Sequence, residues 1–256
     1  MSGAVLRVSL LAIAGCWVCA CGRVGVHEIV LPTSVDGGDA GLPDAGGPRD
    51  SATTLGPCPN PPAAVGGMLL IDDVEDGNGD ISERDGRGGA WYTVNDGSST
   101  GMQVPAPRQR VTPVMGGAQN SNFAVRMWGS GFSVWGAALG VPLSERGMTQ
   151  CAYDARDALG IRFYAKGSGT VTISVASSAT VPESEGGTCT ARCFDYHAIR
   201  KQLSADWASY QIAWSELRQS GWGAATNFSP GEIMYLEFAF GVNVSFDVYL
   251  DDLAFY

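Results

Sequence analysis

The chain has 256 residues and a formal net charge of −10, from 16 Lys and Arg against 26 Asp and Glu. A protein this acidic repels nucleic acids and anionic lipid surfaces, so both are poor candidates for partners. Glycine is abundant at 35 residues, and charged residues make up only 16% of the chain. With many Val, Thr, Tyr and Trp in short runs, this composition predicts an all-β domain rich in turns.

The first segment, residues 1–21, is predicted to be a lipoprotein-type signal peptide. Its only charge is Arg7, and the apolar run over residues 8–18 is too short to span a membrane. Residues 13–16 (Ile-Ala-Gly-Cys) and 18–21 (Val-Cys-Ala-Cys) each resemble the lipobox of bacterial lipoproteins, whose cysteine becomes the lipidated first residue. We expect lipidation at Cys21, because cleavage at the alternative, Cys16, would leave a very short apolar region. An ordinary cleaved signal with incidental cysteines is the other interpretation.

Residues 22–67 are predicted to form a disordered Gly/Pro/Asp/Ala linker. Residues 36–41 and 43–47 are near-repeats of Asp, Gly and Ala, and four prolines follow at positions 57, 59, 61 and 62. Such a segment cannot bury enough apolar surface to offset its chain entropy. We therefore expect a tether that holds an exported domain at the cell envelope, on the outer membrane or cell surface, through a lipid anchor only.

The folded domain is predicted to span residues 68–256. Apolar and alternating runs predict strands at 68–73, 90–94, 122–128, 132–141, 159–165, 170–176, 209–214, 232–240 and 244–255. Clusters of Gly, Pro, Asn and Asp separate these runs, and residues 215–219 suggest one helical turn. The pattern predicts a β-sandwich of the jelly-roll type.

The final strand carries a carboxylate that breaks its pattern. Val244, Phe246, Val248 and Leu250 alternate with polar residues, and continuing the alternation places Asp252 on the apolar side. A buried carboxylate needs hydrogen bonds or a cation. We expect the first and last strands to be neighbours and to share a structural calcium ion; an ordinary hydrogen-bonded carboxylate is the alternative. The predicted ligands are Asp72, Asp73, Glu75, Asp76 and Asp252.

A second acidic segment, residues 76–80, has the Asp-x-Asn-x-Asp spacing that begins some calcium loops. It has Ile81 and Arg87 where an EF-hand needs Gly and Glu, so we interpret it as a solvated turn.

Four cysteines beyond the N-terminal apolar segment suggest disulfides in an oxidising compartment. Cys189 and Cys193 are close enough in sequence to close a small disulfide loop, which leaves Cys58 and Cys151 as a second pair. A zinc site is the less favoured alternative, because no Cys-x-x-Cys occurs among them and His197 is the only nearby imidazole.

Several stretches resemble a known family. They are Leu-Ile-Asp-Asp-Val-Glu-Asp at 70–76, Leu-Asp-Asp-Leu-Ala-Phe at 250–255, and internal segments at 131–137, 153–156 with 159–167, and 207–210 with 214–217. In this order they resemble carbohydrate-binding modules of the family 11 type and the wider galactose-binding-like jelly rolls. The resemblance implies a jelly roll, often with structural calcium, and glycan binding in many but not all members.

Glycan binding needs aromatic faces beside planar polar groups. Several predicted strands place both on the phase opposite their apolar residues, and a possible rim strand at 90–94 adds two more aromatics. The predicted glycan-binding residues are Trp91, Tyr92, Arg126, Trp128, Arg162, Tyr164, Tyr235, Glu237, Asp247 and Tyr249. Tyr and Trp also suit strands without any ligand, so a purely structural role is the alternative.

No catalytic constellation stands out. Residues 97–101 match Gly-x-Ser-x-Gly around Ser99, but the α/β context of a nucleophile elbow is missing. We therefore expect a non-catalytic glycan-binding lipoprotein. The alternative is a structural or protein-interaction lipoprotein with the same fold, and a glycosidase or esterase is the least expected.

Overall fold

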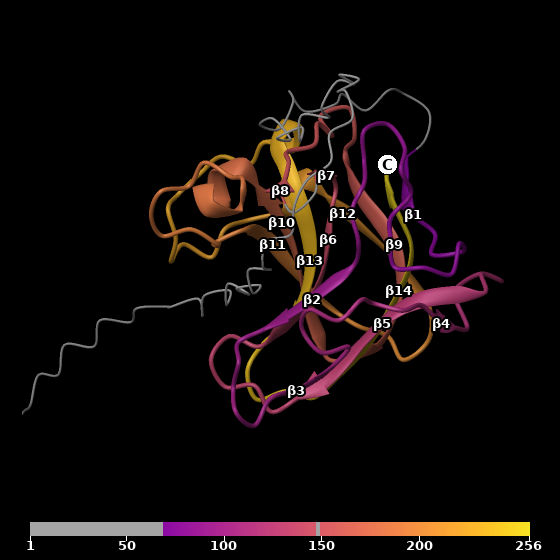
Figure 1. Ribbon diagram of the computed structural model, residues 1–256. Coiled ribbons are helices and arrows are strands. Elements are labelled where there is room, and N and C mark those ends of the chain that lie inside the picture. Colours follow the sequence, from indigo (N-terminus) through magenta and orange to yellow (C-terminus); the bar gives the residue numbers. More distant parts are fainter. Residues whose placement is uncertain (1–68, 147–148) are drawn as a thin grey trace, which may run out of the picture. The chain divides into compact units, whose positions relative to one another are not determined.

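A computed structural model describes residues 69–146 and 149–256, which fold into two stacked antiparallel sheets (Figure 1). The predicted signal peptide, the linker and Cys16, Cys21 and Cys58 lie outside these residues. Within them, no helix is long and apolar enough to cross a bilayer.

We call the first sheet the β14 sheet. Its strands follow the order β12 (Ala208–Ala213), β9 (Gly160–Ser168), β14 (Phe246–Phe255), β5 (Phe123–Ser130) and β3 (Met102–Val104). Two short strands extend it, because β1 (Leu70–Asp72) pairs with β14 and β4 (Val114–Met115) pairs with β5.

The second sheet, the β13 sheet, has the order β11 (His197–Gln202), β10 (Thr170–Ser177), β13 (Ile233–Phe240), β6 (Ala137–Pro142) and β2 (Tyr92–Asn95). Outside the sheets lie a small hairpin and four 3-10 turns: β7 (Glu145–Arg146) with β8 (Thr149–Gln150), η1 (Ser178–Thr180), η2 (Glu183–Glu185), η3 (Trp214–Glu216) and η4 (Pro230–Glu232). The chain crosses between the sheets repeatedly, from β5 to β6, β9 to β10, β11 to β12, and on through β13 to β14. The predicted all-β jelly-roll sandwich is confirmed.

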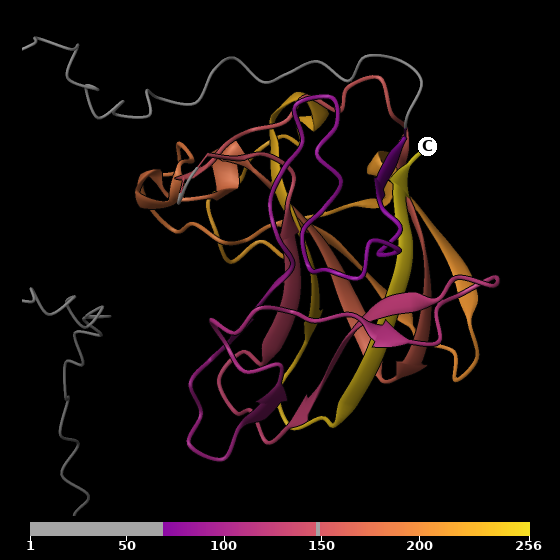
Figure 2. The same ribbon diagram turned by 45° about the vertical axis from the view of Figure 1, so that its right-hand side comes forward.

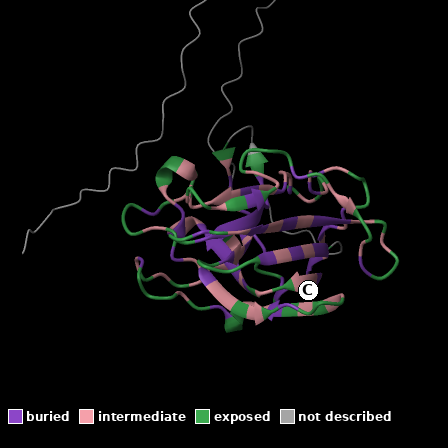
Figure 3. Cartoon of the chain, turned by 90° about the horizontal axis from the view of Figure 1, so that it is seen from below, coloured by how far each residue is buried: buried purple, intermediate pink, exposed green. Residues whose placement is uncertain are grey.

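The core lies between the two sheets, where the alternating apolar residues meet. Phe163 of β9 packs edge-on against Phe238 of β13, with ring centroids 5.0 Å apart. Val248 and Leu250 of β14 are fully buried beside them. Figure 3 shows this arrangement, with buried residues between the layers and exposed ones in the loops. Burial of these side chains is the main term that stabilises the fold.

The first and last strands are neighbours, as predicted. Leu70 of β1 faces Ala254 of β14, and Figure 2 shows β1 beside the end of β14. The predicted direction of Asp252 is wrong. Its φ of 50° marks a β-bulge, and the register with β9 shifts between Asp251 and Ala254. A bulge inserts one residue and reverses the alternation, so Asp252 faces outward while Leu253 is buried in the core.

The predicted strand over 132–141 begins only at Ala137. The Asp96 carboxylate accepts hydrogen bonds from the backbone N–H groups of Val134, Trp135 and Gly136, each at 2.9 Å, and so holds this segment as a loop. The strands β3 and β11 were not predicted, because their residues are largely polar or exposed and show little apolar alternation. The predicted helical turn at 215–219 is the 3-10 turn η3, which begins one residue earlier.

Candidate functional site

The outer side of the β14 sheet gathers aromatic and charged side chains from three neighbouring strands, β9, β14 and β5, and from the residue that precedes β12. Because the sheet is antiparallel and in register, residues on the outward phase stand opposite one another: Tyr249 faces Arg126 on one side and Lys166 on the other. We call this surface the aromatic face. Its members are Trp207, Arg162, Tyr164, Lys166, Asp247, Tyr249, Arg126 and Trp128.

Tyr249 occupies the centre of the aromatic face, between two cations. The Arg126 guanidinium lies 4.8 Å from the Tyr249 ring centroid, and the Lys166 ammonium lies 4.7 Å from the same centroid. Lys166 also lies 4.8 Å from the Trp207 ring, which meets Tyr249 edge-on at 6.3 Å. Cation–π contacts of this kind hold the rings in place, so the centre of the face is preorganised.

Arg126 is held by a second interaction. Its Nε and one Nη donate to the two carboxylate oxygens of Asp247, at 2.9 and 2.7 Å. This bidentate pair raises the pKa of Arg126. Both side chains remain about one-third exposed, at 35% and 36%. The guanidinium therefore keeps N–H groups that can reach a ligand.

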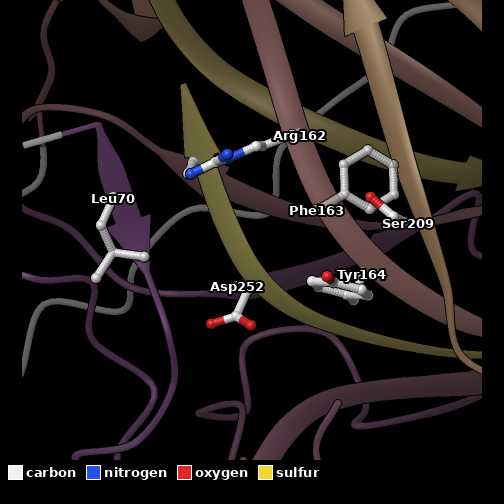
Figure 4. Close-up of a pocket in the computed structure, with 7 residues that line it drawn as sticks. Leu70, Arg162, Phe163, Tyr164, Ser209 and Asp252 are labelled. Carbon is white, nitrogen blue, oxygen red and sulfur yellow. The ribbon is translucent and has the colours of Figure 1, made fainter. Parts of the chain in front are cut away.

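A recess of about 340 Å³ opens at one end of the aromatic face, near β1 (Figure 4). Its lining residues are Leu70, Arg162, Phe163, Tyr164, Ser209, Asp252 and Ala254. Burial, followed by repulsion from Asp73 and Glu75, raises the pKa of Asp252, whereas Arg162 lowers it. The recess therefore offers a cationic donor, a carboxylate acceptor and an aromatic ring within one small volume.

A second recess of about 380 Å³ lies at the other end of the face. It is lined by Met102, Arg126, Trp128, Gly129, Ser130, Ser245, Phe246 and Asp247. Asp252 lines the first recess and Asp247 lines the second. The two residues are five positions apart on β14, which separates the recesses by roughly 16 Å at about 3.3 Å per residue. The face thus forms an elongated surface with a recess at each end.

The structure divides the ten predicted glycan-binding residues among three places. Six share the aromatic face: Arg126, Trp128, Arg162, Tyr164, Asp247 and Tyr249. Trp91 lies in the core at 2% exposure and donates through Nε1 to Asp72 at 2.7 Å, so its ring is not available to a ligand. Tyr92, Tyr235 and Glu237 lie on the outer side of the other sheet. Alternation predicts which residues point outward, but it does not predict which sheet a strand joins.

Two members of the aromatic face were not predicted. Lys166 continues the outward phase of β9 beyond Arg162 and Tyr164, so a longer predicted strand would have included it. Trp207 precedes β12 and gives no alternation signal of its own. Its position becomes informative only once β12 is known to lie beside β9.

Asp72 and Glu75, two of the predicted calcium ligands, accept hydrogen bonds from protein groups. Asp72 accepts hydrogen bonds from Trp91 and from the backbone of Val74, and burial raises its pKa to about 6. Glu75 accepts bonds from the Ser121 hydroxyl and from the backbone N–H groups of Asn122 and Phe123, and these bonds lower its pKa to about 2. Both carboxylates therefore have roles that need no metal ion.

The remaining predicted ligands are Asp73, Asp76 and Asp252. Asp73 accepts a hydrogen bond from the Glu75 N–H at 3.3 Å, and Asp76 accepts bonds from the Asn78 N–H and side-chain amide at 3.1 and 2.8 Å. Across residues 69–146 and 149–256, no group of three or more His, Cys, Asp or Glu side chains is arranged to hold a metal ion. Calcium binding therefore stays a prediction.

The Cys189–Cys193 disulfide is formed, with the two Cα atoms 5.8 Å apart, which confirms this predicted pair. The predicted pair of Cys58 with Cys151 stays a prediction, since Cys58 lies outside the described residues. A zinc site that uses all four cysteines is incompatible with the bond between Cys189 and Cys193.

No protein-family model matches the chain, and no curated protein matches it by sequence. Among solved structures, it is similar to the family 11 carbohydrate-binding module of the cellulosomal cellulase Lic26A-Cel5E of Clostridium thermocellum, with 14% identity, 75% of this chain and 95% of that chain covered, and a TM-score of 0.49. It is also similar to the family 30 module of the cellulosomal cellulase Cel9D-Cel44B of the same organism. The identity is 14%, the match covers 65% of this chain and 90% of that chain, and the TM-score is 0.44. A third similar structure is the N-terminal cellulose-binding domain of β-1,4-glucanase C from Cellulomonas fimi. The identity is 14%, the match covers 76% of this chain and 97% of that chain, and the TM-score is 0.34. Family 11 modules, which the sequence resembles, are therefore among the solved structures that this chain is similar to.

Proposed function

We propose that the aromatic face binds a polysaccharide and that the protein is a non-catalytic glycan-binding lipoprotein. The observation that supports this proposal is that Trp207, Tyr249 and Trp128 share one face: Trp207 meets Tyr249, Trp128 stands opposite Asp247, and Lys166 and Arg126 lie beside the Tyr249 ring. Aromatic rings stack on the apolar sides of sugar rings, while guanidinium, carboxylate and hydroxyl groups bind sugar hydroxyls. The elongated face and its two end recesses suit a chain of several sugars.

Substitutions on the aromatic face test this proposal. We expect Tyr249→Ala and Trp128→Ala to abolish or weaken retention in affinity gels that contain neutral β-glucans, β-galactans or uronic-acid polymers. Trp222→Ala is the matched control, because Trp222 is 57% exposed and lies on a loop away from the face. Absence of binding to every polymer, or equal loss in the control, would refute the proposal.

The proposed location is the cell envelope, through a lipid on Cys21. The predicted signal peptide and the linker over residues 22–67 support it, since together they describe an exported domain on a tether. Labelling with a fatty-acid analogue in a bacterial host tests the anchor. We expect the label on the wild type and on Cys19→Ala, and its loss in Cys21→Ala. Loss in Cys16→Ala instead would assign the lipid to Cys16.

A protein-binding role has an observation of its own. Val134, Trp135, Val242 and Val244 are exposed by 71%, 49%, 39% and 41% on two loops, at 131–136 and 241–245, neither of which carries a charge. The loops lie together, because the Asn243 N–H donates to the Phe132 carbonyl at 2.9 Å. A photo-crosslinker at position 135 should capture one envelope protein, with or without added sugars, if these loops form an interface. A smear of unrelated products would argue against it.

A further inference from the structure

Three cations lie on the aromatic face, and one of them has a carboxylate partner. Arg126 forms the bidentate pair with Asp247. Arg162 and Lys166 form no ion pair within the part of the chain that the structure describes. Both belong to β9 and lie on its outward phase. Their positive charges are therefore available to a ligand that lies on the face.

Lys166 is surrounded by aromatic rings rather than by carboxylates. Its cross-strand partner in β14 is Tyr249, and Tyr164 lies two positions before it on β9. Continuing the register between β9 and β12 places Trp207 on its other side. The cation–π contacts with Tyr249 and Trp207 hold the Lys166 ammonium at the level of the rings. A sugar that stacks on this surface therefore meets a fixed positive charge with N–H donors.

Arg162 carries the second available charge, at the recess near β1 (Figure 4). Its side chain is exposed, and its guanidinium is a planar fork of donors that matches the two oxygens of a carboxylate. Arg162 and Lys166 are four positions apart, so roughly 13 Å of strand separates them at about 3.3 Å per residue. Two cations at this spacing, on one side of one strand, suit a polymer that carries several negative charges along its length.

The acidity of the whole protein does not exclude an anionic ligand at this face. The formal net charge is −10, but physiological salt largely screens charges that are more than about 8 Å apart. Around the face, the three cations stand against two carboxylates, Asp247 and Asp252. Asp73 and Glu75 repel Asp252 from the β1 end. The surroundings of Lys166, which has no carboxylate partner of its own, are therefore the most positive part of the face.

We propose that the aromatic face is specific for a polysaccharide that contains uronic acids, with Lys166 and Arg162 binding the sugar carboxylates. This inference rests on the proposed glycan binding at the same face and names its ligand class. The rings of Trp207 and Tyr249 stack on the sugars whether or not these are charged. The two cations discriminate, because a neutral polymer leaves both of them without an anionic partner.

Affinity electrophoresis of the full-length chain tests the ligand class, in gels that contain polygalacturonate, alginate or hyaluronan. EDTA in every gel removes divalent ions that could bridge two carboxylates. The methyl ester of each polymer is the matched ligand, since it keeps the sugars and linkages but removes the charges. We expect at least one polyuronate to retain the protein, and its methyl ester to bind about tenfold more weakly. Dextran sulfate is the arm that distinguishes sulfated from carboxylated polymers, and it should bind more weakly than the polyuronate.

Substitutions that remove one positive charge test the two residues. Lys166→Gln and Arg162→Gln should each weaken polyuronate binding about tenfold and leave binding of the methyl ester nearly unchanged. Lys201→Gln and Arg200→Gln are the matched controls, because they remove the same charge from β11 in the other sheet, and neither should affect binding. Asp252→Asn removes a negative charge from the recess of Arg162, so it should strengthen polyuronate binding.

The outcomes separate this inference from the proposed function on which it rests. Retention by neutral polymers alone, equal binding of a polyuronate and its methyl ester, or tighter binding of dextran sulfate would overturn the uronic-acid assignment. Equal losses in Lys166→Gln and Lys201→Gln would overturn it as well. In each of these cases glycan binding at the face stands if Tyr249→Ala still abolishes retention. Retention by no polymer, charged or neutral, would refute the proposed function and this inference together.

Discussion

The buried pair of Asp72 and Trp91 gives the most direct prediction about the energetics of this fold. Asp72 is 1% exposed, and its carboxylate accepts hydrogen bonds from the Trp91 indole and the Val74 backbone. Asp72→Asn removes the titratable group and keeps its size. The variant therefore separates the effect of ionisation from the effect of packing.

The magnitude follows from the pKa shift of Asp72. Burial raises this pKa from 3.8 to about 6, against the lowering effect of the two hydrogen bonds. A group whose pKa is raised in the folded state contributes stability below its unfolded pKa, and this stability is lost as the pH rises through the folded pKa. A shift of about two units corresponds to about 3 kcal/mol. Relative to the asparagine variant, the wild type should lose about 3 kcal/mol of unfolding free energy between pH 4 and pH 7.

Urea denaturation at pH 4, 5, 6 and 7, followed by near-ultraviolet circular dichroism, measures this difference. Asp73→Asn is the matched control, because Asp73 is adjacent in sequence and only partly buried. A difference between the wild type and Asp72→Asn that stays constant with pH, or that grows in favour of the wild type as the pH rises, would refute the reasoning.

Three further predictions concern the disulfide, the glycines and calcium. Replacing Cys189 and Cys193 by serine should lower the unfolding free energy by about 2 kcal/mol, because the disulfide closes a short loop. Chemical denaturation measures this loss, and an unchanged unfolding free energy would show that the bond does not stabilise the fold. Gly136→Ala should lower the unfolding free energy by more than about 3 kcal/mol, because φ is +111° and the new Cβ would collide with the Phe240 carbonyl. Gly97→Ala should lower it by only about 1 kcal/mol, because φ is +70° and no neighbouring atom lies within 4 Å of the new Cβ. Similar losses in the two variants would contradict the steric argument. If calcium binds at Asp73, Asp76 and Asp252, chelation with EDTA should lower the Tm of the wild type but not that of Asp252→Asn. Identical melting curves of the wild type with EDTA and with calcium would exclude a stabilising ion.

The sequence was sufficient to predict the strands that have one buried side. In β14, the alternation of Phe246, Val248 and Leu250 predicted a half-buried strand, and its acidic end predicted the neighbouring β1. The direction of Asp252 could not be predicted, because alternation assumes a regular strand. The bulge that reverses it depends on pairing with β9, which a single strand does not reveal.

The candidate site was predictable only in part, for a similar reason. Tyr164 and Tyr235 have the same local pattern, an aromatic residue on the outward phase of an apolar strand. They lie on different sheets because β9 pairs with β14 whereas β13 pairs with β6 and β10. Trp91 has turn residues on both sides, as a rim residue would, yet it is buried against Phe238. Which strands pair is a tertiary property, and it decides which aromatics form a common surface.

The central position of β14 has a consequence for how the chain matures. This strand is the last of the sandwich in sequence, yet it lies between β9 and β5 and also pairs with β1. During synthesis, those three strands leave the ribosome with hydrogen-bonding edges that nothing covers until residues 246–255 arrive. Exposed edges of this kind promote intermolecular pairing, and such distant contacts form slowly. Premature termination shortly before Phe246 should therefore yield aggregates rather than a slightly shortened domain.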